Sequence, residues 1–155
     1  MIKINVISRN KAWFQYIKYP EKYIENRILK INKKYKKFKQ KKIYCTLLLS
    51  DGSEIKRLNK KFRKKNKSTD VLSFPFYDKK IILKKLVTDK EIYLGDIIIN
   101  FSKVIFKKKK KSKFLDEFNK LWIHGLAHLF GFDHKNNKDF KVMKQVEKEL
   151  LSYIN

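Results

Sequence analysis

Apolar residues recur along the chain with two different periods, and these periods predict its strands and helices. Alternating or continuous runs rich in isoleucine, valine and aromatic residues are typical of strands, whereas apolar residues three or four positions apart are typical of helices. The pattern predicts strands at 2–8, 42–50, 71–76 and 91–100, and helices at 21–35, 53–63, 113–130 and 138–153. A further helix is expected from Phe101 until a run of lysines interrupts it. Because strands and helices are mixed without regular alternation, we expect an α+β fold in one domain spanning residues 1–155.

Three details of the pattern carry expectations of their own. Pro75 predicts an edge strand or a strand end, because proline cannot donate a hydrogen bond to a neighbouring strand. The lysine-rich residues 77–91 have no regular period and predict a surface excursion or a hairpin. Further apolar side chains are expected in the core, namely Ile55, Leu58 and Phe62, residues 72–76, Trp122, and Phe140, Val142, Met143, Val146, Leu150 and Leu151 of the last helix.

Composition excludes several classes of protein. Hydrophobic residues make up 43% of the chain and are spread along it, which argues against disorder. No apolar run approaches the roughly 18 to 20 residues that span a bilayer, and the N-terminus has no secretory signal pattern. Cys45 is the single cysteine, so no disulfide can form within the chain. A reducing, cytoplasmic location with no membrane association fits best.

The formal net charge of +25 has two readings. Positive charge on this scale is typical of proteins that bind nucleic acids. Lysine, isoleucine, asparagine, phenylalanine and tyrosine are all abundant, however, as expected for an AT-rich genome, so a solvated lysine-rich surface remains the alternative. Arginine occurs only at positions 9, 27, 57 and 63 among the 40 basic residues, which makes each arginine more informative than a lysine.

The three histidines of the chain lie together in H-G-L-A-H-L-F-G-F-D-H, residues 124–134. On a helix, His124 and His128 are about 40° apart around the axis and about 6 Å apart along it, so both rings can converge on one ion. Gly131 permits a sharp reversal that returns His134 as a third ligand. Three nitrogen ligands leave one position of a tetrahedral zinc open, which is typical of a catalytic site. Asp133 is either a residue that orients a ligand or a structural cap of the turn.

Gly125 is the informative departure from the zinc-protease signature H-E-x-x-H. The glutamate at that position is the general base for peptide hydrolysis, and glycine has no side chain to replace it. A zinc peptidase is therefore disfavoured. Two explanations of the glycine stay open: close packing of the helix, or room beside the metal for a bulkier substrate.

This stretch resembles the signature H-G-x-L-H-L-x-G-y-D-H of the YbeY family of bacterial rRNA-maturation endoribonucleases, with Ala127 in place of leucine. Residues 58–76, L-N-K-K-F-R-K-K-N-K-S-T-D-V-L-S-F-P-F, are similar to the family's L-N-x-x-Y-R followed by T-D-V-L-S-F-P, with Phe62 in place of tyrosine. Residues 94–99, L-G-D-I-I-I, are similar to its L-G-D-I-x-I strand. The order and spacing of the three motifs fit from about residue 42 to 135.

The resemblance implies a zincin-like α+β fold, in which a small mixed sheet packs against helices and the metal site lies on a helix and its following turn. It implies one Zn²⁺ per chain held by His124, His128 and His134, with His124 and Arg63 in catalytic roles. The implied activity is single-strand-specific cleavage of RNA in late 16S rRNA 3′-end maturation and ribosome quality control. Single-stranded RNA, rRNA and the small ribosomal subunit are the implied partners.

The chemistry of the residues agrees with this reading and leaves alternatives. Arg63 could grip the scissile phosphate with its planar guanidinium, or it is a surface arginine. Lysines at 60–67 and 107–111 could follow the RNA backbone, or they are merely solvated. Asp70 and Asp96 are expected in structural roles, and no general acid is identifiable. Two other functions stay open: a zinc hydrolase of another substrate class, and a ribosome-associated RNA-binding module whose metal is structural.

Overall fold

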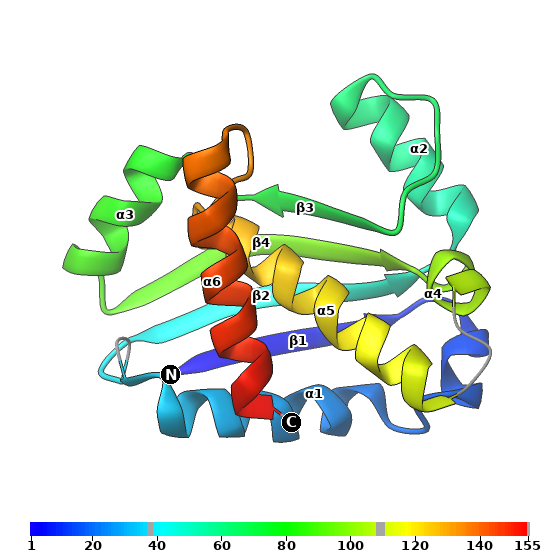
Figure 1. The fold of residues 1–155 in the computed structure, drawn as a ribbon, viewed down its shortest axis with the longest axis horizontal. Coiled ribbons are helices and arrows are strands. Elements are labelled where there is room, and N and C mark those ends of the chain that lie inside the picture. The colour runs from blue at the N-terminus through cyan, green and yellow to red at the C-terminus, as the bar shows by residue number, and fades with distance from the viewer. Residues whose placement is uncertain (37–38, 108–110, 155) are drawn as a thin grey trace.

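The protein is described from a computed structural model covering residues 1–36, 39–107 and 111–154. Its strands form one sheet in the order β1-β2-β4-β3, with β1 at Ile2–Ser8, β2 at Lys42–Ser50, β3 at Val71–Pro75 and β4 at Glu91–Asn100. β1, β2 and β4 are parallel, and β3 runs antiparallel to β4 (Figure 1). The small mixed sheet confirms the predicted α+β class. β3 is an edge strand that ends at Pro75, which confirms the expectation drawn from that proline.

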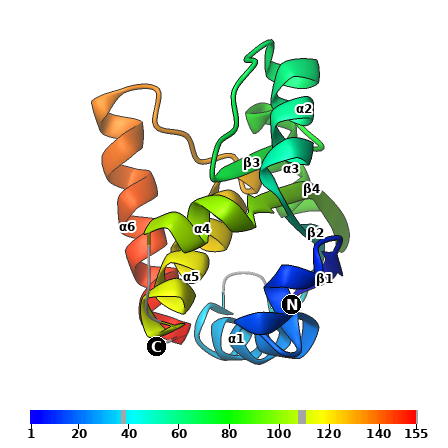
Figure 2. The same cartoon turned by 90° about the vertical axis from the view of Figure 1, so that its right-hand side faces the viewer.

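The helices divide between the two faces and one edge of the sheet. Their bounds are α1 Pro20–Lys34, α2 Gly52–Arg63, α3 Lys79–Thr88, α4 Phe101–Lys107, α5 Lys111–Leu129 and α6 Asn137–Ile154, with a 3-10 helix at Lys11–Gln15. Figures 1 and 2 show α5 and α6 on one face of the sheet, with α2 standing across from α6 near β3. The small cluster of Ile55, Leu72 and Ile98 packs α2 against the other face.

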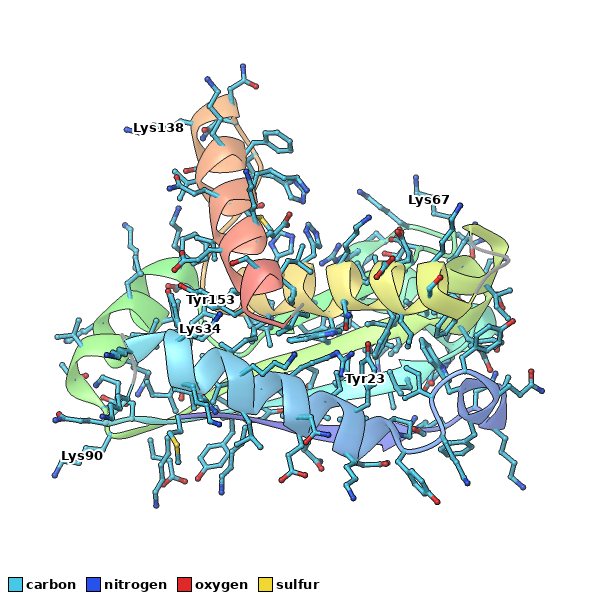
Figure 3. The ribbon with its side chains drawn as sticks, turned by 60° about the horizontal axis from the view of Figure 1, so that its bottom comes forward. Tyr23, Lys34, Lys67, Lys90, Lys138 and Tyr153 are labelled. Carbon is cyan, nitrogen blue, oxygen red and sulfur yellow. The ribbon has the colours of Figure 1, made fainter. Side chains whose placement is uncertain are left out.

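α5 is the central helix of the core, because apolar side chains cover most of its surface. Phe114, Phe118 and Trp122 are fully buried, and Phe114 and Phe118 contact the ring of Trp13. Its one buried amide, Asn119, accepts hydrogen bonds from Trp122 Nε1 at 3.0 Å and from Tyr23 Oη at 3.2 Å. Tyr23 belongs to α1, which runs below α5 in Figure 3.

α1 also reaches the C-terminal end of the chain. Lys34 near the end of α1 lies over the ring of Tyr153 at 5.7 Å, and both are labelled in Figure 3. Lys30 Nζ donates to the carbonyl of Ile154 at 3.1 Å. These contacts hold the end of α6 against α1 and thereby set the angle at which α6 crosses α5.

Gly125 is the point of closest approach between α5 and the sheet. A Cβ placed on Gly125 would lie 2.6 Å from Cγ2 of Ile97 on β4 and 3.1 Å from its Cγ1, closer than side chains tolerate. The missing side chain therefore faces the sheet, so that close helix packing explains this glycine. The space that a side chain at position 125 would take up is filled by the side chain of Ile97 on β4.

Two expectations of the sequence pattern are wrong. A surface excursion or a hairpin without regular period was expected at residues 77–91, but residues 79–88 form helix α3. The side chain of Asp78 begins this helix, because it accepts a hydrogen bond from Ile81 N at 2.9 Å. Ile82 is its one buried side chain, so almost no apolar period marks it. Four large hydrophobic side chains expected in the core are exposed instead, Phe62 by 57%, Phe76 by 65%, Phe140 by 47% and Val142 by 44%, and so is Pro75.

We expect Gly125→Ala to destabilise the protein although alanine favours helix. The helix gains about 1 kcal/mol from alanine, but overlap with Ile97 costs about 1–3 kcal/mol. The free energy of unfolding, measured in urea, should fall by up to about 2 kcal/mol. In an Ile97→Ala background the clash is gone, and the same substitution should raise stability. Stabilisation by Gly125→Ala in the unmodified protein would contradict the packing explanation.

Candidate metal centre

The structure brings the three histidines together where α5 ends. His124 and His128 lie one turn apart on the same side of α5, and Gly131 adopts a φ of 87°, in the left-handed region. Phe132 N donates to the carbonyl of Ala127 at 3.1 Å, which closes the reversal after the helix. One nitrogen from each of the three imidazole rings lies within 4.8 Å of the others.

Hydrogen bonds fix the orientation of the two helical rings. His128 Nδ1 lies 3.0 Å from the carbonyl oxygen of Phe132, which can only accept, so Nδ1 carries the proton. His124 Nδ1 lies 2.6 Å from Oε1 of Glu147. With both Nδ1 atoms engaged, the Nε2 atoms of His124 and His128 face each other at 3.1 Å.

This geometry fits a zinc ion. Tetrahedral zinc, with bonds of about 2.0–2.1 Å to histidine nitrogens, holds two such nitrogens about 3.3–3.4 Å apart. The Nε2 atoms of His124 and His128 are 3.1 Å apart, close to that separation, so both can bind one ion. The pKa of His128 is lowered to about 4 by burial and by the neighbouring His124 and His134. His128 is therefore neutral at pH 7, as a metal ligand must be.

Glu147 is a site residue that the sequence analysis missed. It lies on α6, is only 7% exposed, and holds His124 Nδ1 with one oxygen and Lys144 Nζ, at 2.7 Å, with the other. Burial acts to raise the pKa of Glu147, but the hydrogen bonds from His124 and Lys144 outweigh it and the pKa is lowered. The signal was present in the sequence, because Glu147 occupies the apolar stripe of α6 together with Met143, Leu150 and Ile154.

Asp133 and Asp70 shape the backbone around the histidines. Asp133 Oδ1 accepts from the backbone N–H of His134 at 2.8 Å, and its Oδ2 lies 3.2 Å from Lys135 Nζ. These contacts favour the reading of Asp133 as a cap of the turn, and a role in orienting a metal ligand stays a prediction. Asp70 Oδ1 accepts from Val71 N at 3.0 Å at the start of β3, as a structural residue does.

Arg63 lies at the end of α2, on the outer edge of β3. Its Nη2 donates to the carbonyl of Ser73 at 3.1 Å, and the rest of the guanidinium is exposed. The lysines of residues 60–67 are likewise exposed around this end of α2. The side chains of the other predicted lysine run, 107–111, lie outside the described residues. The catalytic role of Arg63 stays a prediction.

The mixed sheet and the histidine triplet on a helix and turn define the class: an α+β protein with a candidate metal centre of the hydrolytic type. The family model described as endoribonuclease YbeY matches residues 9–155, and the chain belongs to this family. Membership confirms the resemblance drawn from the three motifs. It also confirms the class of enzyme, an RNA-cleaving hydrolase, that the resemblance implied.

Individual relatives agree with the family match. An endoribonuclease YbeY from Pelagibacter ubique (strain HTCC1062) is 45% identical over 158 aligned residues, covering 99% of this chain and 97% of that protein. One from Caldicellulosiruptor bescii is 39% identical over 110 residues, covering 68% of this chain and 70% of its own. The solution structure of TM1509 from Thermotoga maritima superposes with a TM-score of 0.62 at 27% identity, covering 99% of this chain and 89% of that one. Among the described residues, no helix is both long and apolar enough to cross a membrane.

We expect Glu147→Gln to weaken zinc binding by about 10- to 100-fold, because the amide cannot hold the Nδ1 proton of His124 as a carboxylate does. Zinc affinity is measured by competition with a chromophoric chelator. Glu149→Gln is the matched control on the same helix, since Glu149 is exposed and bonds Tyr153. Equal affinities for the two variants would contradict the role given to Glu147.

The stability of the metal-free protein should depend on His128 below neutral pH. The pKa of His128 falls from 6.5 to about 4 on folding, so the unfolded chain takes up this proton first as the pH drops. Stability is therefore lost between pH 6.5 and 4, and the melting temperature should decline across that window. His128→Asn retains a donor toward the Phe132 carbonyl and removes the titration, so its profile should be flatter. Parallel profiles for the two proteins would contradict this account.

Proposed function

We propose that the protein is a zinc-dependent, single-strand-specific endoribonuclease that acts in late maturation of the 16S rRNA 3′ end and in ribosome quality control. One Zn²⁺ per chain would be held by His124, His128 and His134. The observation that carries the proposal is the convergence of the histidine nitrogens within 4.8 Å, with the Nδ1 atoms of the two helical rings engaged elsewhere. The proposed enzyme works in the cytoplasm as one domain, with the small ribosomal subunit as its partner.

The chain would supply three histidine ligands, two of them held in place by hydrogen bonds, and leave the remaining direction to substrate and water. When bound, a zinc ion with three histidine ligands provides a lowered pKa for water and polarisation of a phosphoryl oxygen. Glu147 keeps the Nδ1 proton on His124, so that Nε2 remains the ligand atom. His134 is exposed, which leaves this side of the group accessible to a long substrate.

Arg63 is proposed to bind the scissile phosphate. Its anchor on the Ser73 carbonyl uses only Nη2, which leaves the other donors of the guanidinium for two phosphate oxygens. Negative charge grows on these oxygens as the attacking oxygen adds to phosphorus and before the bond to the leaving oxygen has broken, so a fixed cation stabilises the transition state more than the ground state. Lysine lacks the planar pair of donors and should replace Arg63 poorly.

Hydrolysis of peptides is disfavoured by the residues around the metal. Gly125 faces Ile97 on the sheet, so no carboxylate stands where the protease base would be. Glu147 does not take its place, because both of its oxygens are engaged by His124 and Lys144. No general acid is identifiable for the leaving oxygen either, so water or the metal itself is proposed to serve in its place.

Cleavage of defined single-stranded and duplex RNAs by the zinc-loaded protein tests the proposal. We expect single strands to be cleaved, duplexes to be spared, and kcat to fall by about 100-fold or more in Arg63→Ala, the range seen when one fixed transition-state donor is removed. His128→Ala should lose both zinc and activity. Arg57→Ala is the matched control, since Arg57 is also exposed on α2 and pairs with Glu54 at 3.7 Å.

Three outcomes would contradict the proposal. Unimpaired RNA cleavage by both Arg63→Ala and His128→Ala would overturn the mechanism. Cleavage of another substrate class without cleavage of RNA would favour a different zinc hydrolase. Association with the small subunit and no cleavage at any zinc loading would favour a binding module with a structural metal.

A further inference from the structure

Two cavities flank the histidine group, one on each side. The α6 cavity, of about 610 Å³, lies between α5, α6 and the start of β3, and His124 forms part of its wall. The α3 cavity, of about 490 Å³, is lined by His128, by the residues that follow β3 and by the turn after α5. Asp70 and Val71 border the first cavity, and Pro75 and Phe76 border the second, so β3 connects the two past the histidines.

The two cavities differ in the charge of their walls. The α3 cavity has two lysines and two aspartates in its wall, Lys79, Lys135, Asp78 and Asp133. Its lysines have acidic neighbours: Lys135 Nζ lies 3.2 Å from Asp133, and Lys79 Nζ lies 3.9 Å from Asp139 on α6. The charges on this side therefore cancel.

The α6 cavity has a surplus of cations. Lys120, Lys144 and Lys148 line it together with two acidic residues, Asp70 and Glu147. Lys144 is bound to Glu147 at 2.7 Å. Lys120 and Lys148 are exposed, and within the described residues neither forms an ion pair with an acidic side chain. These two ammonium groups are available to an anion in the cavity.

The two lysines lie on the helices that carry or hold His124. Lys120 and His124 are four residues apart on α5, so they share one face about 6 Å apart along the axis. Lys148 lies one residue beyond Glu147 on α6, the helix that holds His124 from the other wall. An extended polyanion that has one phosphate at the histidines would carry its next phosphates between these helices.

We propose that the protein holds its RNA substrate asymmetrically, with Lys120 and Lys148 binding backbone phosphates on one side of the scissile bond. The proposal rests on the proposed function and adds to it the path of the strand. On this side the strand lies in the α6 cavity, and on the other it passes the charge-balanced α3 cavity. Nucleotides in the α6 cavity strengthen binding through their phosphates. Nucleotides beside the α3 cavity add little electrostatic attraction.

Binding of a strand that cannot be cleaved tests this path directly. The probe is a fluorescein-labelled oligouridylate with phosphorothioate linkages, which keep the backbone charge and resist hydrolysis, titrated by anisotropy against the zinc-loaded protein at several salt concentrations. The slope of log K against log salt concentration is negative, and each phosphate contact on a single strand adds about 0.7 to its magnitude. The double variant Lys120→Ala with Lys148→Ala should therefore reduce that magnitude by about 1.4. Lys22→Ala with Lys33→Ala on α1 removes the same net charge and should leave the slope unchanged. Equal slopes for the two double variants would overturn the proposal.

The asymmetry itself is tested with RNAs that contain one ordinary phosphodiester linkage in an otherwise phosphorothioate strand. Lengthening the strand on one side of that linkage should lower KM, lengthening it on the other side should not, and the dependence should vanish in the lysine double variant. Equal dependence on both sides would overturn the proposal. If the probe binds as expected and no RNA is cleaved, the proposed function fails while the assigned path stands. If the wild-type protein binds the probe without salt dependence, the path fails whatever the cleavage result.

Discussion

The candidate site depends on the fixed orientation of two imidazole rings one turn apart on a buried helix. The Nε2 atoms of His124 and His128 stand 3.1 Å apart, close to the separation of two histidine ligands on one zinc ion. The fold maintains it from several sides: close packing of α5 on β4 at Gly125, the Phe132 carbonyl behind His128, and Glu147 behind His124. The site is thus a consequence of how α5 is clamped between the sheet and α6.

The helices and the strand around the histidines each contribute different charged groups to the site. α6 contributes the carboxylate that orients His124 and two of the three lysines of the α6 cavity, and α5 contributes the third. β3 and α2 contribute the edge on which Arg63 is anchored. A three-histidine centre by itself serves many hydrolases. Position 125, beside His124, has no carboxylate, and cations lie at the edge of β3 and in the α6 cavity. Both features favour a phosphodiester over a peptide as the substrate. Family membership as an endoribonuclease agrees with this preference.

Sequence alone was sufficient where the physical signal is local. Strands and most helices followed from apolar period, and the histidine triplet followed from helical spacing and one glycine. Helix α3 escaped prediction because only Ile82 is buried, and Phe62 and Phe76 were misplaced because an edge strand and a protruding helix leave apolar residues in solvent. A buried role for Glu147 was signalled by its place in the apolar stripe of α6, but its partner His124 depends on which element packs against α5. The same holds for the partner of Gly125, because no local pattern specifies that packing.

X-ray absorption at the zinc edge of the zinc-loaded protein distinguishes a catalytic from a structural centre, since it reports both the kind and the number of ligands of the metal. We expect three imidazole nitrogens at about 2.0–2.1 Å and one exchangeable oxygen from water. A fourth protein ligand, such as a carboxylate or a thiolate, would close the coordination sphere. Such a spectrum would mark the metal as structural and contradict the account of a catalytic centre.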